Sequence, residues 1–490
     1  MIKYYLLVSI FFVCPAATHL QTDTLYLSFE KAIELALQNA VELKLAQSQL
    51  KENAHNQKLF YLGLQPNLSF NGTAPNLSRS IEARPLPDGR DAFVNRSTMY
   101  NGLGVSLSHQ IPSLNASWYA RTDLERLDVF KTDQFAGSTT YFFTPISVGI
   151  NIPLFRFNEI KWGKQQFQLL DDEMIAEQAV IRESVINRTL NLYSVCFQLQ
   201  KQLEVIERQI EDVQILFGIK KKLNELGSVP KAEILRLELQ LQNNESSFQQ
   251  RLVDFNNAKM KLFDYINLRT TKDIFFVNPD WEPISVDFFT AIQQATQNKY
   301  ILSNHILRRQ TLEAELLKTK KENGVNLNLN ASVGLNKTDE NLQDLYRDLL
   351  DREVIALTLQ VPITGWKAQL HREEIVSEKI YREDLIMQEE ITDIKRDLKI
   401  LFDEYNSLVD RIIIEKEAVE ITAEIYELTR TQFLAGNENF NQLNIVNKER
   451  DQAFISYFNT VFDTIVKYFE IREVCLYDFV GNKTLVKDQY

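Results

Sequence analysis

The chain has 490 residues and a formal net charge of −12, with 24% charged and 44% hydrophobic residues. This composition is that of a folded chain with a sizeable core, and not that of a disordered or polytopic helical membrane protein. The acidic balance argues against a nucleic-acid partner, because binding to phosphates needs a basic face.

The N-terminus predicts a secretory signal peptide over residues 1–20. Lys3 gives a short cationic start, an apolar stretch runs to Val13, and a small residue follows at Ala16. The stretch is too short to span a membrane, and this order of features is typical of export signals. We expect cleavage between Ala16 and Leu20.

The three cysteines predict neither a lipid anchor nor a disulfide. Cys14 would suggest lipid attachment, but Val13 stands where a lipobox needs a small residue. Cys196 and Cys475 both lie in apolar, helical stretches, where we expect buried free thiols.

The mature chain repeats itself once, and we divide it into repeat 1 (21–275) and repeat 2 (276–490). Identity between the copies is low, but short matches recur in the same order, which is the sign of an internal repeat. Repeat 1 carries about 50 extra residues between its strands on this alignment. The matched pairs are Ala32-Ile33 with Ala291-Ile292, Asn67–Asn71 with Asn326–Asn330, Ile152-Pro153-Leu154 with Val361-Pro362-Ile363, and Leu226-Gly227 with Ala435-Gly436.

Each repeat reads as a helix, strands, a very long helix, a turn and a returning helix. We expect a first helix from Glu30 to about Leu62, and helical hairpins at 163–267 and 366–479 with tips near 227 and 436. Repeat 2 also shows apolar residues at steps of three and four, which predict helices wound about each other as a coiled coil. These residues are Ile391, Ile394, Leu398, Leu401, Tyr405, Leu408 and Ile412.

Four segments alternate aliphatic with small polar residues and predict strands at about 65–72, 144–155, 325–335 and 354–363. Soluble sandwich strands show the same alternation. Four such runs between coiled-coil helices of an exported chain favour tilted membrane strands instead. Four strands cannot close a barrel, so several chains must contribute to one.

The insert of repeat 1, about 73–143, contains two further strand-like stretches, Leu103–Ile111 and Leu114–Arg121. We interpret it as an elaborated surface loop or an added hairpin. The predicted fold class is therefore mostly α with a β-barrel contribution: two repeats of helix, strands, long helix, turn and helix, with four transmembrane strands per chain.

In this order the motifs resemble the TolC family of outer-membrane efflux proteins, over nearly all of the mature chain. The residues that carry the likeness are Leu27–Asn39 in the first helix, Ile152–Phe155 and Val361–Ile363 at strand exits, and Leu226–Pro230 at a hairpin tip. The resemblance implies a homotrimer with a twelve-stranded barrel in the outer membrane of a Gram-negative bacterium. It also implies a helical tunnel through the periplasm.

The same resemblance implies passive, porin-like transport, with energy from an inner-membrane transporter of the RND or ABC type. A periplasmic adaptor (membrane fusion) protein would contact the tips, here Gly227, Ser228, Val229, Gly436 and Asn437.

The resemblance also places a periplasmic gate just past the second tip. Its candidates are Glu438, Asn441 and Asn444. Family members close this gate with acidic residues, and the two asparagines stand where carboxylates often occur. An amide ring keeps the hydrogen bonding but loses the charge, so an acidic, cation-binding gate is not expected here.

No constellation predicts catalysis, a cofactor or a metal. His371 and Glu374 lie one helical turn apart, but a solvated helix face explains them better than half a metal site. His55, His109 and His305 are isolated in the sequence. The primary hypothesis is an export duct for small molecules or proteins, and the alternative is a periplasmic coiled-coil adaptor or structural rod that does not span the membrane. The sequence leaves the cargo open.

Overall fold

The computed structural model describes residues 24–85, 87, 89–132, 136–225, 230–270, 272–297, 300–322, 324–435 and 437–486. These residues form two compact units. The first comprises residues 24–44, 181–286 and 400–473, and the second comprises residues 45–180, 287–399 and 474–486. The units cut across the two sequence repeats, because the longest helix of each repeat has residues in both.

The two copies contain helices of nearly the same lengths in the same order. In the first copy they have 11, 23, 67 and 36 residues, and in the second 10, 23, 69 and 36. They are α1 (Phe29–Asn39), α2 (Val41–Gly63), α3 (Glu159–Glu225), α4 (Lys231–Ile266), α5 (Phe288–Gln297), α6 (Tyr300–Glu322), α7 (Trp366–Leu434) and α8 (Phe440–Cys475).

The expectation of a single first helix from Glu30 to about Leu62 is wrong, because the helix is interrupted at Ala40. Its backbone there has ψ 130°, which is outside the helical range, and α2 starts at the next residue. Side-chain caps start the first helix of both copies. Ser28 Oγ accepts from the Lys31 amide at 3.3 Å, and Asp287 Oδ2 accepts from the Thr290 amide at 2.8 Å.

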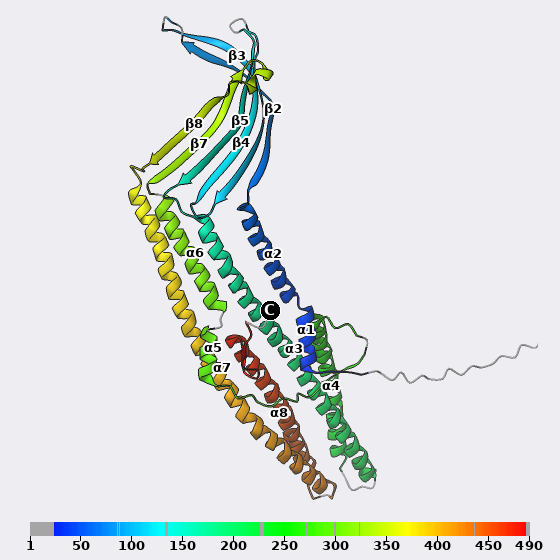
Figure 1. Ribbon diagram of the computed structural model, residues 1–490. Helices are drawn as coiled ribbons and strands as arrows, with labels where there is room; N and C mark the ends of the chain where they lie inside the picture. Colours follow the sequence, from blue (N-terminus) through cyan, green and yellow to red (C-terminus); the bar gives the residue numbers. More distant parts are fainter. Residues whose placement is uncertain are drawn as a thin grey trace, which may run out of the picture. The chain divides into compact units, whose positions relative to one another are not determined.

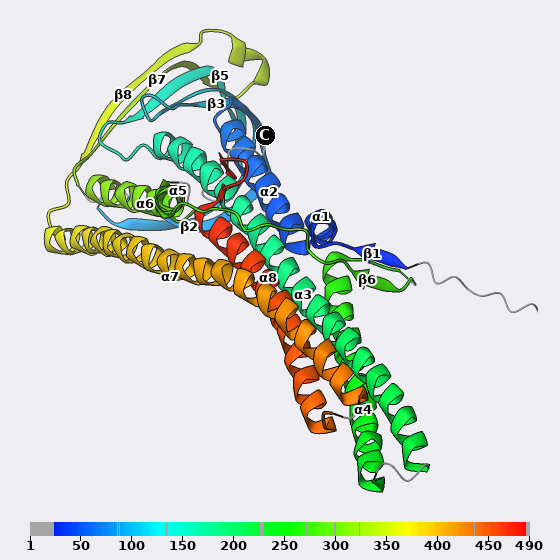
Figure 2. The same ribbon diagram turned by 90° about the horizontal axis from the view of Figure 1, so that it is seen from below.

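The first unit has an aromatic core around a short parallel strand pair, β1 (Leu25–Leu27) with β6 (Ile274–Phe276) (Figure 2). Tyr193 on α3 is fully buried, and its hydroxyl lies 2.8 Å from the Leu27 carbonyl oxygen. Gln200 holds β6 from the same helix, since its side-chain amide bonds both the N–H and the C=O of Phe276. Helix α3 therefore fixes the strand pair by side-chain hydrogen bonds as well as by packing.

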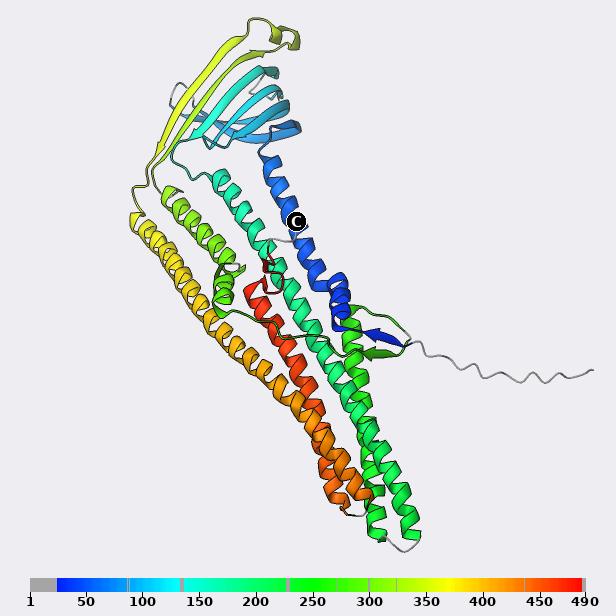
Figure 3. The same ribbon diagram turned by 60° about the horizontal axis from the view of Figure 1, so that its bottom comes forward.

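Further along the first unit, the two helical hairpins α3–α4 and α7–α8 pack on one shared apolar cluster (Figure 3). Each of the four helices contributes to it, so the hairpins are held together by burial of apolar surface. The cluster contains Val213, Leu216, Leu237, Tyr426, Phe433, Leu443 and Val446. The predicted apolar seam of repeat 2 lies within α7, and none of its seven residues is exposed.

The second unit contains a six-stranded antiparallel sheet in the order β2-β3-β4-β5-β7-β8 (Figure 1). The expected fold class is confirmed, but the sheet has two strands more than expected. The insert is an added hairpin, because β3 pairs with β2 on one side and with β4 on the other. The strands are β2 (Asn67–Pro85), β3 (Asp91–Ile111), β4 (Ala116–Val129), β5 (Ser138–Pro153), β7 (Asn326–Asp339) and β8 (Leu350–Gln360).

At one end of the strands the sheet connects to four helices: α2 leads into β2, β5 into α3, α6 into β7 and β8 into α7. At the other end of the strands, β7 and β8 are joined through a short helix, η1 (Leu342–Tyr346). A small hairpin of β9 (Tyr477–Asp478) and β10 (Lys483–Thr484) follows α8. None of the described helices has a stretch that is long and apolar enough to cross a membrane.

Candidate functional site

The sheet has one apolar and one polar face, and the strand register places like residues side by side. Residues directly opposite each other on paired strands point to the same face. Leu107 pairs with Ala120, Ala120 with Val148, and Val148 with Val333, so one apolar row crosses β3, β4, β5 and β7. We call the side of the sheet that carries this row the apolar face.

The apolar face is largely uncovered in this chain. Ile355 and Leu357 on β8 are 82% and 62% exposed, and Phe70 on β2 is 70% exposed. Val333, at the middle of β7, is 57% exposed. Soluble monomers rarely expose a continuous apolar surface of this extent, so the face must contact another apolar phase.

Charged residues end the apolar face on the side away from the helices. Arg126 pairs with Tyr141, and Tyr141 with Asp339, so a polar row crosses β4, β5 and β7 beyond the aliphatic rows. Aromatic rings lie close to this limit, with the ring of Phe143 centred 5.0 Å from that of Tyr346. An aliphatic band bordered by aromatic and charged residues is typical of strands in lipid.

The opposite, polar face carries many small residues, together with larger polar side chains on β4 such as Arg121 and Glu125. Glycines allow neighbouring side chains to lie flat on it: a Cβ at Gly149 would meet the Tyr119 ring at 2.5 Å, and one at Gly104 would collide with Asp123 Oδ1. Other members of the face are Ser69, Ser106, Ser147, Asn328, Asn330, Ser332 and Thr358.

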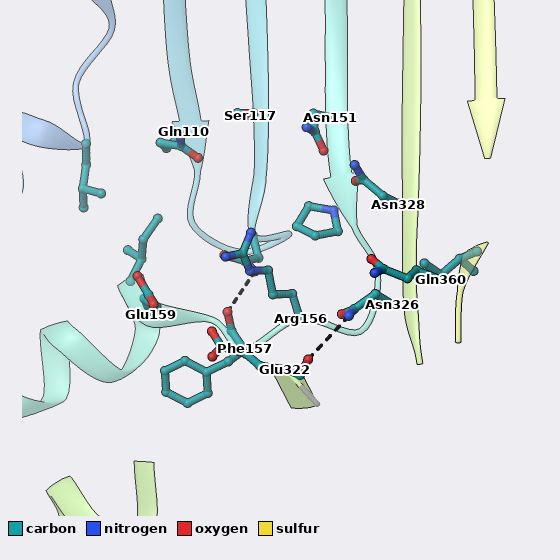
Figure 4. Close-up of a pocket in the computed structure, with 15 residues that line it drawn as sticks. Gln110, Ser117, Asn151, Arg156, Phe157, Glu159, Glu322, Asn326, Asn328 and Gln360 are labelled. Atoms are coloured by element: carbon teal, nitrogen blue, oxygen red, sulfur yellow. Dashed lines mark hydrogen bonds between the residues drawn. The ribbon is translucent and has the colours of Figure 1, made fainter. Parts of the chain in front are cut away.

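A cavity of about 760 Å³ lies where the polar face meets the helix ends, and amide side chains dominate its wall (Figure 4). Asn151, Asn328 and Gln360 come from β5, β7 and β8 and lie along one side of it. Amides both donate and accept hydrogen bonds, so this wall suits water and polar solutes without selecting one charge. The remaining polar side chains are Gln110, Asn115, Ser117, Arg156, Glu159, Glu322 and Asn326.

Hydrogen bonds from a tight turn fix one side of this cavity. Asn115 joins β3 to β4 in the left-handed conformation, with φ 53°, and its Nδ2 donates to the Phe157 carbonyl at 3.1 Å. Asn158 Nδ2 donates back to the Pro112 carbonyl at 2.8 Å. Asn115 was not predicted as a turn residue, because it falls inside the expected stretch Leu114–Arg121, whereas β4 begins only at Ala116. Asparagine is nevertheless a turn signal.

The predicted tip residues fall into two groups. Gly227, Ser228, Val229 and Gly436 lie outside the described residues. Asn437 is exposed, and its backbone N–H donates to the backbone carbonyl of Gln432, at the end of α7, at 3.0 Å.

The gate candidates stand at the start of the last helix. Asn439 caps α8, because its side-chain Oδ1 accepts from the backbone N–H of Gln442 at 3.0 Å. Asn441 and Asn444 therefore lie in the first turns of α8. Asn444 is half-buried, and its Oδ1 accepts from Gln240 Nε2 on α4 at 2.9 Å, whereas Asn441 is exposed. Glu438 is half-buried just before the cap.

A polar network that the sequence analysis missed lies beyond the gate candidates. Tyr426 on α7 donates to Asp212 Oδ2 on α3 at 2.8 Å, and the guanidinium of Arg450 on α8 lies 3.9 Å from the Tyr426 ring centre. Burial, followed by the hydrogen bond to Asp212, raises the pKa of Tyr426 to about 12. Gln209 Nε2 and the Arg450 guanidinium both donate to Asp451. The network joins three helices at one level.

The histidines have no catalytic or metal-binding arrangement among the described residues, where no group of three or more His, Cys, Asp or Glu side chains could hold a metal ion. His371 and Glu374 are 2.9 Å apart and mostly exposed. His305 is buried on α6, and its two ring nitrogens contact Glu383 at 2.6 Å and Glu390 at 3.0 Å. The expectation that His305 is isolated is therefore wrong, because helix packing brings both glutamates from α7.

No family model matches the chain, and no curated protein matches it by sequence. Solved structures do match. The CmeC outer membrane channel of Campylobacter jejuni superposes with a TM-score of 0.65 at 12% identity, over 94% of this chain and 87% of that one. CusC, a transmembrane channel, gives 0.66 at 12% identity over 92% and 93%. The chain has the fold of these channels.

The open state of the MtrE outer membrane channel of Neisseria gonorrhoeae gives the same result, with a TM-score of 0.62 at 11% identity over 91% of this chain and 88% of that one. The coverage is nearly complete on both sides, so the shared fold includes the long helical hairpins as well as the sheet. At this identity the likeness defines the fold, and function has to be argued from the residues of this chain.

Proposed function

We propose that this chain is one subunit of a passive outer-membrane channel, the exit duct of a multi-component efflux or secretion system. The observation that carries the proposal is the apolar face, which crosses five of the six strands in the row from Leu68 to Val333 and is largely uncovered. Such a face would contact lipid acyl chains, and the polar face would then contact the water inside the channel. The fold shared with outer membrane channels supports this orientation.

The strand lengths support a membrane position. From Leu327 to Leu335 the apolar face of β7 covers nine residues, the length that a tilted strand needs to cross the hydrocarbon core. The same alternation continues on β5. On β8 this face is aliphatic from Leu359 to Ile355 and becomes charged at Glu353. A sheet that stays open in lipid would leave backbone groups unpaired at its edges.

Among the described strands, β2 pairs only with β3 and β8 only with β7, so these two are the edges of the sheet. Identical copies that pair edge to edge would satisfy both. We propose a homotrimer, on the strength of the resemblance to the TolC family.

The helical hairpins provide the second part of the proposal. The adaptor-contact tips are Gly227, Ser228, Val229, Gly436 and Asn437, and a periplasmic adaptor bound there would connect the duct to an inner-membrane transporter of the RND or ABC type. Cargo, either small molecules or proteins, would pass without energy input from this chain. Asn441 and Asn444, together with Glu438, would narrow the tip as a mainly uncharged gate.

The alternative, a periplasmic adaptor or structural rod, explains the helices but not the sheet. In water the apolar face would cost about 25 cal/mol for every Å² that stays uncovered. A rod outside the membrane would need a partner to cover that face, and it would have no use for a polar face of small residues opposite.

Membrane fractionation combined with gel migration tests the proposal. Outer membranes from cells expressing the full chain are extracted in detergent and run on SDS gels with and without boiling. We expect the chain in the outer-membrane fraction and a slow, multi-subunit band that converts on boiling to a subunit band, the full chain having a mass of 57.0 kDa. A monomer in the soluble periplasmic fraction would overturn the proposal.

A further inference from the structure

The hairpin β3–β4 is the part of the sheet that the four expected strands do not include. Its register continues both faces of the sheet, with one irregularity on each side, at Thr73/Asn76 and at Arg121/Asp123. Leu68 pairs with Leu107, and Leu107 with Ala120, so the apolar row that runs through Val148 and Val333 also passes through this hairpin to β2.

The apolar part of the hairpin has the length of a membrane strand. On β3, the stretch from Leu103 to Ile111 pairs residue by residue with Leu124 to Ala116 on β4, and each stretch has nine residues. The apolar face of β4 ends at Arg126, in the same row as Asp339 on β7. The apolar band of the hairpin therefore reaches one row further than that of β7, where Lys337 shares a row with Phe143 and Leu124.

The polar face of the hairpin also matches its neighbours. Tyr119 on β4 covers Gly149 on β5, and Asp123 covers Gly104 within the hairpin. Ser69 Oγ on β2 lies 2.7 Å from Ser106 Oγ on β3. A hairpin outside the membrane would be free to vary on both faces, whereas this one keeps mainly apolar residues on one side, with His109 and Thr122 as polar exceptions, and small or polar residues on the other.

We infer that β3 and β4 cross the membrane as a third hairpin, so that each subunit supplies six strands to the wall of the channel. The inference rests on the proposed function, because it assumes that the apolar face meets lipid. Six is an even number, so the edge strands β2 and β8 run in opposite directions and identical subunits can continue the antiparallel order.

The consequence is a wider channel than the twelve strands implied by the resemblance. Three subunits give eighteen strands. With about 4.8 Å between strands and a tilt of about 40°, the ring is about 36 Å across instead of about 24 Å. The added hairpin also brings Arg121, Asp123 and Glu125 to the polar face, so it supplies charges to the inner wall.

Single cysteines labelled with an environment-sensitive fluorophore test the inference in the reconstituted full-length assembly. Leu107→Cys and Ala120→Cys probe the apolar face of the hairpin, and Ser108→Cys and Ser117→Cys probe its polar face. Val148→Cys and Val333→Cys are the reference positions on the expected strands. Cys196 and Cys475 are buried, and the unsubstituted chain gives the background labelling.

Fluorescence is measured with spin-labelled acyl chains as the lipid quencher and with iodide as the aqueous quencher. We expect the lipid quencher to act on Leu107→Cys and Ala120→Cys as strongly as on the reference positions, and iodide to act on Ser108→Cys and Ser117→Cys. Leu103→Cys and Leu124→Cys are a second pair on the same face, for use if either first variant fails to assemble.

Two other outcomes are distinguishable. If the hairpin positions respond to iodide on both faces while Val148→Cys and Val333→Cys respond to lipid, the third membrane hairpin is wrong and the channel stands. If the reference positions also respond to iodide alone, the proposed function itself is wrong.

Discussion

Tyr426 on α7 donates a hydrogen bond of 2.8 Å to Asp212 on α3, and Arg450 of α8 packs on the same ring at 3.9 Å. Helix α3 is thereby joined, beyond the gate candidates, to the two helices of the second hairpin, which lie far from it in the sequence. Because Tyr426 is buried and its acceptor is a carboxylate, this hydrogen bond is stronger than one exposed to water.

Tyr426→Phe removes only the hydroxyl and leaves the Asp212 carboxylate without that donor. We expect a loss of about 1–2 kcal/mol in the free energy of unfolding, since a hydrogen bond to a charged group is lost while the ring still packs. Thermal unfolding followed by circular dichroism measures it. Tyr381→Phe is the control, because that side chain on the same helix is 61% exposed. Equal melting temperatures for both variants would contradict the role given to the network.

Glu473 near the end of α8 predicts a pH dependence. Burial raises the pKa of its carboxyl above the ordinary 4.5, although the hydrogen bond from Asn187 opposes the shift. The folded state therefore binds the proton more tightly than the unfolded state, and stability falls as the pH rises from about 4.5 through the raised value. Glu473→Gln keeps an acceptor for Asn187 and removes the charge.

We expect Glu473→Gln to flatten the decline in melting temperature between acid and neutral pH and to raise the melting temperature at neutral pH. The control is Glu449→Gln on the exposed side of the same helix. A parallel pH profile for Glu473→Gln and the wild type would contradict the prediction.

The sheet predicts opposite outcomes for two glycines. A Cβ at Gly334 would lie 2.6 Å from the Ile146 carbonyl oxygen and 2.9 Å from Ser147 Cα, both backbone atoms that cannot move aside. At Gly72 the nearest atom is a leucine side-chain carbon at 3.4 Å. We expect Gly334→Ala to destabilise the sheet by about 1–3 kcal/mol through overpacking, and Gly72→Ala to change little. The temperature at which the detergent-extracted assembly dissociates on gels measures both, and equal temperatures would contradict the packing described.

The gate candidates predict a weak response to divalent cations. Asn441 and Asn444 carry no charge, so we expect Mg²⁺ on the tip side to leave the current of the wild-type channel nearly unchanged. Asn441→Asp with Asn444→Asp should create a cation site and lower the current, because the substitution keeps the acceptor for Gln240 and adds carboxylates. Gln442→Glu adds charge at an exposed position beside them and serves as the control. Strong Mg²⁺ block of the wild type would contradict the amide gate.

Much of this fold could be predicted from the sequence, because two periodicities are strong. The aliphatic alternation at Leu327–Leu335 predicts β7, and the apolar seam from Ile391 to Ile412 predicts the helical structure of α7. For the insert, the sequence left a surface loop and an added hairpin as alternatives. The charged residues Arg121, Asp123 and Glu125 interrupt the apolar pattern unless the residues of the two faces of the sheet are considered separately. The pairing of β4 with β3 and β5 provides that separation, and it is a long-range property.

The site was predicted less completely. Amide residues at Asn441 and Asn444 were identified by position, but the hydrogen bond from Gln240 and the pair Tyr426–Asp212 depend on how two helical hairpins pack. No local pattern marks them. Gly227, Ser228, Val229 and Gly436 lie outside the described residues and stay predictions.

Ionic current through planar lipid bilayers tests the central claim most directly. Detergent-extracted, full-length protein is added to one side of the bilayer, and the current is recorded at constant voltage. We expect discrete current steps that need the slow-migrating assembly and disappear after boiling. Protein that stays associated with the bilayer but gives no steps above the lipid background would contradict a channel.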